Sequence, residues 1–309
     1  MTEVLVPKSQ VEGTDSASTL VVGAGAVGLY IASCLTLAGV AVSMMSKTSF
    51  DWLCVDHGNF ENKLPVVKAN LRVSEYIFVC LKAHQVEAAL PLIEPAVTES
   101  SILVVLQNGI DHGRFVDRLV PDSQIVPCIV MFASDRSAPG CTRLVTQHPS
   151  LIIPTMPAGS DIARLFHRNH LTVQSVEVWG QLAWEKLMVN AVVGAVASFA
   201  GNTYESCLNE DLFDLCVEYG CEVATIATAE GYTMTRLDVE SILRRAMISG
   251  GRHVPSIVRS REMGQATEWE SRNGVIVRLA QKHGINTPLS RAFMTLLKHS
   301  ERIGEKTYA

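Results

Sequence analysis

A glycine-rich turn near the amino terminus constrains the fold more than any other feature of this chain. Residues 19–28 read TLVVGAGAVG, so a short apolar run leads directly into the pattern Gly23-x-Gly25-x-x-Gly28. Where a strand turns into a helix, the first glycine allows the tight turn and the second lets the backbone come close to a pyrophosphate. The third lets the helix pack closely against the strand. The pattern is typical of a dinucleotide-binding turn.

The residues after the turn support this interpretation. An apolar, helix-like segment covers 29–37, and a second strand is predicted over 40–44. Phosphates would bind the free N–H groups at the positive end of the helix. A glycine-rich turn in some other parallel sheet is the alternative. The residues predicted to contact the dinucleotide are Gly23, Gly25, Ala26, Val27 and Gly28.

The loop after the second strand favours NADP over NAD as the cofactor. A site for NAD usually places Asp or Glu about 20 residues past the glycines, where it accepts a hydrogen bond from the ribose 2′-hydroxyl. Here residues 45–49 read MSKTS, and the first carboxylate is that of Asp51. Lys47 and the neighbouring hydroxyls suit a 2′-phosphate, which a carboxylate would repel. An ordinary solvated lysine is the alternative.

Composition narrows the class of protein. The chain has 309 residues, 48% hydrophobic and 18% charged, which predicts about two domains with packed cores. A formal net charge of −5 and scattered Lys and Arg residues argue against nucleic-acid binding. Eight cysteines without a Cys-x-x-Cys pattern indicate reduced thiols in a cytoplasmic protein. His167 and His170 have no third ligand nearby, so we predict no metal site.

One uncharged segment, residues 16–46, superficially resembles a membrane span. Its four glycines and its change of period are better explained by a buried strand followed by a helix. Acidic residues precede the segment, where a signal peptide would carry positive charge. We therefore predict neither a membrane segment nor a signal peptide. Residues 1–18 are expected to form a flexible extension.

Strand-like and helix-like segments alternate through the first half of the chain. Strand patterns cover 76–81, 102–106 and 125–131, and a helical pattern covers 85–92. This alternation predicts an α/β fold over residues 19–178, with a doubly wound parallel sheet of the Rossmann type. The β-branched stretch 141–153 is expected to complete that domain with antiparallel strands.

From residue 179 onward, long helical patterns dominate. They cover 182–199, 210–230, 237–247, 268–283 and 290–301. We predict an all-helical second domain over residues 179–309, packed closely against the first domain around a cleft.

Two polar residues follow the ends of predicted strands. Lys82 follows the strand over 76–81, and Asn108 follows the strand over 102–106. This edge of an open α/β sheet is where ligands bind. We therefore predict that Lys82 lies near the adenosine-phosphate end of the cofactor and Asn108 near its nicotinamide. A simple Asn-Gly turn is an equal alternative for Asn108.

A lysine at the start of a long apolar stretch is the best candidate for chemistry. Lys186 and Asn190 are four residues apart and share a helix face, and no charge follows over 187–200. A partly desolvated ammonium group donates a proton more readily near neutral pH. The ordinary alternative is a lysine that extends from a helix end into solvent.

Two further candidates come from the last third of the chain. Thr267-x-x-Glu270 matches a capping box, which places Glu268 in the first turn of a helix. Acidic residues are common there because they complement the helix dipole, and the same field favours an ionised partner for an ammonium group. Ser256, after Pro255, is a candidate helix cap or substrate-binding hydroxyl.

In their order and spacing, these motifs resemble the ketopantoate reductases (2-dehydropantoate 2-reductases), two-domain NADP-dependent enzymes of pantothenate synthesis and thus of the coenzyme A pathway. The resemblance runs from Thr19 to Glu301. Besides the glycine turn, it rests on Leu81-Lys82-Ala83-x-Gln85, Gln107-Asn108-Gly109, Trp184-Glu185-Lys186-Leu187-x-x-Asn190, Pro255-Ser256, Thr267-Glu268 and Asn273-Gly274.

The resemblance implies a role for each matching residue. Lys186 aligns with the general acid, and Glu268 aligns with the carboxylate that bonds the substrate oxygen and helps to position the lysine. The substrate contacts that it implies are Asn108, Asn190, Ser256 and Glu268, and the cofactor contacts include Lys47, Lys82, Gln85 and Asn108. The implied reaction is hydride transfer from NADPH to the 2-oxo carbon of ketopantoate, which gives pantoate.

Two departures from the family leave the substrate open. Gly194 stands where many members have a second Asn, and Ser260 replaces a common Asp. A lost hydrogen bond of roughly 0.5–1.5 kcal/mol could shift substrate preference without abolishing activity. The alternatives are therefore a reductase of another 2-oxo acid or small carbonyl compound and, in a different class, a non-catalytic NADP-binding sensor. The oligomeric state also stays open, with a homodimer as one candidate.

Overall fold

The chain divides into two compact units in the computed structural model, which describes residues 3–7, 19–56, 61–68, 73–167 and 170–307. The first unit contains Met1–Gln107 and His112–Trp179, and the second contains Asn108–Asp111 and Gly180–Ala309. The division between Trp179 and Gly180 lies one residue from the boundary predicted at 178. The short segment Asn108–Asp111, predicted to belong to the sheet domain, contacts the helices instead.

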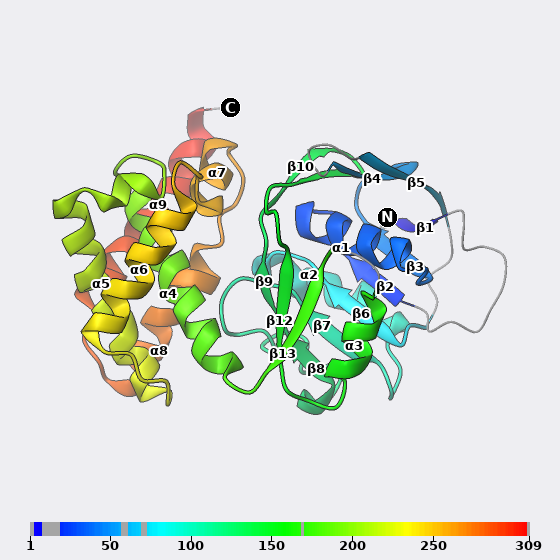
Figure 1. Ribbon diagram of the computed structural model, residues 1–309, viewed down its shortest axis with the longest axis horizontal. Coiled ribbons are helices and arrows are strands. Elements are labelled where there is room, and N and C mark those ends of the chain that lie inside the picture. The colour runs from blue at the N-terminus through cyan, green and yellow to red at the C-terminus, as the bar shows by residue number, and fades with distance from the viewer. Residues whose placement is uncertain (1–2, 8–18, 57–60, 69–72, 168–169, 308–309) are drawn as a thin grey trace. The chain divides into compact units, whose positions relative to one another are not determined.

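A ten-stranded sheet forms the centre of the described part of the first unit (Figure 1). Its strands lie in the order β10-β11-β4-β5-β1-β3-β2-β6-β7-β8. Their bounds are β1 Glu3–Pro7, β2 Thr19–Val22, β3 Val42–Ser46, β4 Trp52–Asp56, β5 Glu61–Lys68, β6 Tyr76–Val79, β7 Ile102–Val105, β8 Ile125–Pro127, β10 Ser134–Ala138 and β11 Cys141–Leu144. Five strands that are adjacent in this order are all parallel: β3, β2, β6, β7 and β8. The direction of winding reverses at β2, which lies between β3 and β6. Ligands bind at such a reversal, outside the carboxyl ends of the strands.

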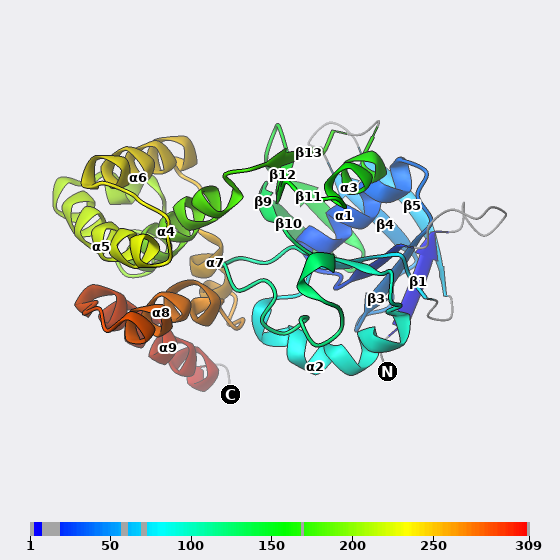
Figure 2. The same ribbon diagram turned by 90° about the horizontal axis from the view of Figure 1, so that it is seen from below.

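Helices cover both faces of the parallel strands, which explains their continuous apolar sequences. Val21 of β2 packs into a core that includes residues of α1 and α3, whereas Leu20 and Val22 pack into a second core with α2. Figure 2 shows α2 on one side of the strands and α1 and α3 on the other. The helices of this unit are α1 Ala26–Leu37, α2 Ala83–Ile93 and α3 Gly159–Leu165, with short 3-10 turns η2 Glu94–Ala96 and η3 Asp122–Gln124.

One strand predicted over 125–131 is in fact two strands in different sheets. The chain leaves the large sheet after β8, and the next strand, β9, belongs to a three-stranded sheet of order β13-β12-β9. The bounds of these strands are β9 Ile129–Met131, β12 Ser150–Pro154 and β13 Thr172–Val176. The stretch predicted as antiparallel, 141–153, pairs in both senses, because β12 is antiparallel to β9 and parallel to β13.

The prediction of a flexible extension over residues 1–18 is wrong for residues 3–7. These residues form β1, which pairs antiparallel with β3 on one side and with β5 on the other. The sequence EVLVP is rich in β-branched and aliphatic residues, and the facing edges of β3 and β5 offer hydrogen-bonding groups to both sides of it. Residues 8–18 lie outside the described part of the chain.

Helices make up the described part of the second unit apart from its loops (Figure 1). Their bounds are α4 Trp179–Ala197, η4 Glu205–Leu208, α5 Glu210–Ala229, α6 Arg236–Gly250, α7 Ser256–Glu262, the π-helical turn η5 Glu270–Gly274, α8 Val275–His283 and α9 Pro288–Thr307. Buried residues of α4 contribute much of the core, which explains why residues 187–200 carry no charge. The helix predicted over 268–283 begins with η5 and continues as α8.

The described residues include all of the cysteines and the long helices of the chain. All eight cysteines lie within the described residues and are free thiols, and burial raises the pKa of Cys34 to about 12, so that this thiol stays neutral. In the part of the chain that the structure describes, no helix combines the length and the apolar character needed to cross a membrane.

A buried amide fastens the π-helical turn to the helical core. Asn273 is fully buried, and its Nδ2 donates to the Ala191 carbonyl at 3.0 Å and to the Tyr219 hydroxyl at 2.8 Å. These bonds join η5 to α4 and α5. Loss of the amide would remove both buried hydrogen bonds and leave a cavity, so it costs more than the net value of one hydrogen bond.

We therefore expect Asn273→Ala to lower the free energy of unfolding by about 1–3 kcal/mol in urea titrations. Gln281→Ala, at an exposed position of α8, is the matched control and should change it by less than about 0.5 kcal/mol. Equal effects of the two substitutions would contradict the role of Asn273.

Candidate functional site

The glycine turn after β2 has the geometry that its sequence predicts. Gly23 has φ +104°, a conformation that favours glycine, and its N–H donates to the Met45 carbonyl at 2.9 Å. A Cβ at Gly28 would lie 1.9 Å from the Gly23 carbonyl oxygen. The first turn of α1 therefore packs directly on the backbone that leaves the strand.

Gly25 differs from Gly23 and Gly28 because no atom of the described residues lies close to it. A Cβ at this exposed position would meet no atom within 4 Å, and the backbone is extended, with φ −77° and ψ 179°. Gly25 is also the N-cap of α1, and it has no side chain to bond the N–H groups of the first helical turn. The open space and the uncapped N–H groups fit a phosphate group of a dinucleotide.

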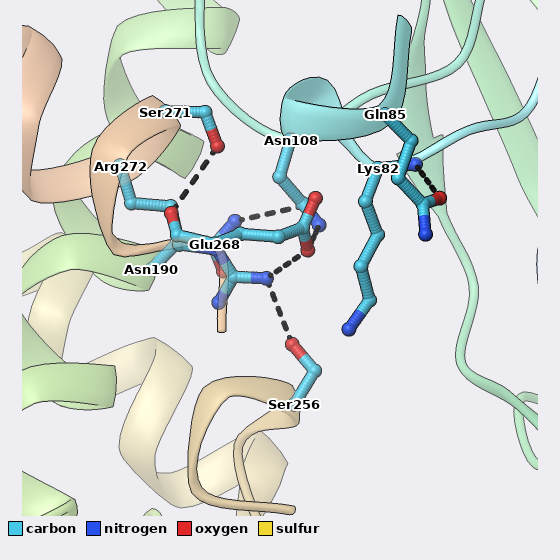
Figure 3. A network of polar contacts seen from close by, with 8 residues as sticks. All are labelled: Lys82, Gln85, Asn108, Asn190, Ser256, Glu268, Ser271 and Arg272. Carbon is cyan, nitrogen blue, oxygen red and sulfur yellow. Dashed lines mark hydrogen bonds and ion pairs between the residues drawn. The ribbon is translucent and has the colours of Figure 1, made fainter. Parts of the chain in front are cut away.

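The predicted cofactor lysines follow the two strands beside β2. Lys47 is exposed and comes directly after β3, in a turn where the Ser46 hydroxyl accepts from the Thr48 N–H at 3.1 Å. Lys82 is half-buried and is the N-cap of α2, after β6. Gln85 closes a capping box there, because its Oε1 accepts from the Lys82 N–H at 3.3 Å (Figure 3). The role that the structure gives to Gln85 is thus to begin α2.

The segment at Asn108 has the geometry of the predicted Asn-Gly turn. Gly109 has φ +104°, as a tight turn requires, and a Cβ there would lie 2.5 Å from the Ser271 carbonyl oxygen. Asp111 forms an ion pair with Arg278 of α8, which holds the segment against the helices. The amide of Asn108 is therefore fixed among the groups of the helical unit.

A connected network of polar side chains surrounds Glu268 (Figure 3). Nδ2 of Asn108 and Nη2 of Arg272 each donate to Oε2 of Glu268 at 3.0 Å. Asn190 Nδ2 donates to Asn108 Oδ1 at 3.4 Å, and Arg272 Nη2 also donates to Ser256 Oγ at 2.9 Å. Four of the predicted substrate-site residues therefore belong to one network, although they come from four separate parts of the chain.

Carboxylate chemistry fixes the direction of these hydrogen bonds. An ionised carboxylate only accepts, so the amide nitrogen of Asn108 must face Glu268, and its oxygen is left to accept from Asn190.

Glu268 immediately precedes the helical residues that begin at Trp269 and does not lie in their first turn as predicted. Its backbone carbonyl accepts from the Arg272 N–H at 3.2 Å.

Sequence reasoning missed Arg272, the one member of the network that carries positive charge. Its side chain is 2% exposed, against 12% for Glu268, and the two form an ion pair. Burial raises the pKa of the nearby Tyr204 hydroxyl, and the positive charge of Arg272 partly opposes that rise. The spacing of four residues from Glu268 was a signal for the pair, but such pairs are common on helix surfaces.

The remaining candidates lie on α4. Lys186 is half-buried and is one helical turn from Asn190, on the same face. Gly194 has a packing role, because a Cβ there would lie 3.0 Å from Cγ2 of Ile257, the neighbour of Ser256. A larger residue at this position would require Ile257 to move by at least a few tenths of an ångström. Within the described ranges, no three His, Cys, Asp or Glu residues gather in a group that could hold a metal ion.

Comparisons with known proteins identify the family of this chain. The family model described as "Ketopantoate reductase PanE/ApbA" matches residues 19–157, and "Ketopantoate reductase PanE/ApbA C terminal" matches residues 179–301. A 2-dehydropantoate 2-reductase of Mycobacterium tuberculosis is 29% identical over 282 residues, which cover 89% of this chain and 95% of that protein.

Solved structures share the fold. A PanE/ApbA family ketopantoate reductase from Ralstonia eutropha has a TM-score of 0.84 at 23% identity, covering 93% of this chain and 99% of that one. D-mandelate dehydrogenase, solved with NADH and anilino(oxo)acetate, has a TM-score of 0.83 at 20% identity, with the same coverage of 93% and 99%.

The contrast between Gly25 and Gly28 gives a testable prediction. Gly28→Ala should lower the free energy of unfolding by about 1–3 kcal/mol, because the backbone must shift to admit the methyl group. Gly25→Ala should change it by less than about 0.5 kcal/mol. It should nevertheless weaken nicotinamide dinucleotide binding about tenfold or more in fluorescence titrations, because a methyl group would occupy the place of the phosphate. Full affinity in a stable Gly25→Ala variant would argue against a phosphate at this turn.

Proposed function

Because the chain belongs to the ketopantoate reductase family and is an oxidoreductase of the 2-dehydropantoate 2-reductase type, we propose that it reduces ketopantoate to pantoate with NADPH. The observation that supports this best is the hydrogen-bonded network of Asn190, Asn108, Glu268, Arg272 and Ser256. It gathers amide, carboxylate and hydroxyl groups suited to a small oxo acid with several hydrogen-bonding oxygens.

The family assignment indicates a nicotinamide cofactor, and the glycine turn is the place where this chain would hold it. Gly23, Gly25 and Gly28 shape the turn, and the N–H groups of Ala26 and Val27 belong to the uncapped first turn of α1. When bound, the cofactor supplies the hydride. We assign its 2′-phosphate to Lys47, with Lys82 as a second basic group, because each follows a strand next to β2 and no carboxylate precedes Asp51 in that loop.

In the proposed reaction, Lys186 donates a proton to the substrate oxygen as negative charge develops there. A fixed cation near that oxygen stabilises charge that exists only in the transition state. Glu268 accepts a hydrogen bond from the hydroxyl that forms when this oxygen is protonated, and it helps to hold the lysine. The amides of Asn108 and Asn190, fixed to one another at 3.4 Å, orient the substrate. Ser256 contributes its exposed hydroxyl.

A same-fold reductase of another 2-oxo acid remains the nearest alternative. This alternative is based on Gly194, which stands where many family members have an Asn. The close approach of Ile257 offers another explanation for glycine at this position, namely packing. Rates of NADPH oxidation with ketopantoate and with a panel of 2-oxo acids distinguish the two. Dinucleotide binding without any carbonyl reduction would instead support a sensor. We expect ketopantoate to have the highest kcat/KM of the panel.

The role of Lys186 is tested by Lys186→Ala. The substitution removes the proton donor, so kcat for ketopantoate reduction should fall about 10²–10⁴-fold while the dissociation constant of NADPH changes little. Lys282→Ala removes a lysine that pairs with Glu230 on the helical unit and should leave kcat near the wild-type value. Unaltered turnover in Lys186→Ala would exclude the lysine as the acid.

The cofactor preference is tested by Lys47→Glu. A carboxylate in place of the ammonium group should weaken NADPH binding about 10-fold or more, because charged hydrogen bonds to the 2′-phosphate are lost. NADH lacks that phosphate, and its affinity should change much less. Arg245→Glu makes the same change of charge at an exposed position of α6 and controls for net charge. Equal weakening of both nucleotides would contradict the assignment.

A further inference from the structure

A buried arginine within the candidate site calls for a functional explanation. Arg272 is 2% exposed, and its Nε is buried without a hydrogen-bond partner among the described residues. Removal of a guanidinium group from water is costly, and an apolar residue of similar volume often stabilises a core better. The structure therefore carries an incompletely compensated charge at the point where the proposed substrate residues meet.

The first effect of Arg272 is on the charge of the site. Glu268 places a carboxylate among the residues that we assign to substrate binding, and this charge opposes the binding of an anionic substrate. The ammonium group of Lys186, the proposed proton donor, no longer offsets it once the proton has been given up. Arg272 Nη2 donates to Oε2 of Glu268 at 3.0 Å, so the pair has no net charge. The guanidinium thereby removes the repulsion that Glu268 would exert on a second carboxylate.

The second effect is on the direction of the Ser256 hydroxyl. A guanidinium group only donates, so Ser256 Oγ accepts the hydrogen bond from Arg272 Nη2 at 2.9 Å. The hydroxyl hydrogen must then point to another acceptor. Ser256 is exposed at the start of α7, and its hydroxyl is thus set to donate to a ligand that accepts. A carboxylate is the strongest such acceptor among small organic groups.

From these two effects we propose that Arg272 makes the site select an anionic substrate. Its guanidinium neutralises Glu268 and fixes Ser256 as a donor to the substrate carboxylate. Arg272 acts through these two residues and is a positioning residue that determines specificity. The inference rests on the proposed function, since it concerns the substrate of the same site.

The test compares two ligands that differ in charge. Ketopantoate carries a carboxylate, whereas its lactone has the same carbon skeleton and no charge. Dissociation constants for both are measured by calorimetry in the presence of NADP⁺, with the wild-type protein and with Arg272→Met. We expect the substitution to weaken ketopantoate binding about 10- to 100-fold and to leave the affinity for the lactone within a few-fold of the wild-type value. The ratio of the two affinities is the decisive quantity.

Two further variants serve as a control and as a second test of the inference. Arg261→Met removes another arginine, one that lies on α7 over the Phe199 ring, and should leave the ratio unchanged. Ser256→Ala removes only the donor hydroxyl at an exposed position and should weaken ketopantoate about 10-fold more than the lactone, which decides the matter if Arg272→Met does not fold.

The outcomes separate this inference from the proposed function. If Arg272→Met weakens both ligands equally, Arg272 has only a structural role and the inference is overturned. If that variant does not fold, an equal effect of Ser256→Ala on both ligands overturns the inference. The reductase assignment stands in either case. If the wild-type protein neither binds nor reduces any 2-oxo acid, the proposed function fails as well.

Discussion

The ion pair between Glu268 and Arg272 determines the arrangement of polar groups in the helical unit. Both side chains are largely buried, and either charge alone would carry a large desolvation cost. Because Oε2 of Glu268 accepts from Arg272 and from Asn108, it sets the orientation of the Asn108 amide and, through it, the contact with Asn190. Arg272 also donates a hydrogen bond to Ser256, so the ion pair helps to set the orientation of that hydroxyl as well. A single pair thus orders side chains from four separate segments.

Whereas an ion pair arranges the polar groups of the helical unit, steric contacts determine the shape of the glycine turn. Gly28 is required because the backbone at Gly23 occupies the place of a side chain, whereas Gly25 borders open space. One glycine therefore serves the packing of the helix on the strand, and the other leaves room outside the protein. The sequence pattern predicts both requirements, and the coordinates add the close approach at Gly28 and the open space at Gly25.

Features that depend on local sequence were predicted well. The apolar run of β2 and the uncharged stretch of α4 reflect burial on all sides, which composition records directly. Residues that depend on distant partners were not. Arg272 matters because Ser256, 16 positions earlier, lies beside it, and the segment Asn108–Asp111 joins the helices through Arg278, 167 positions later. Strand β1 likewise needs two edges that exist only after β3 and β5 have formed.

The position of β1 has a practical consequence for protein production. Among the described strands of the large sheet, β1 lies between β3 and β5 and pairs with both, so truncation before residue 8 would leave two unsatisfied edges facing a gap. Such edges invite intermolecular pairing and aggregation. Expression plasmids should therefore retain Glu3–Pro7, and an affinity tag is better attached at the carboxyl terminus.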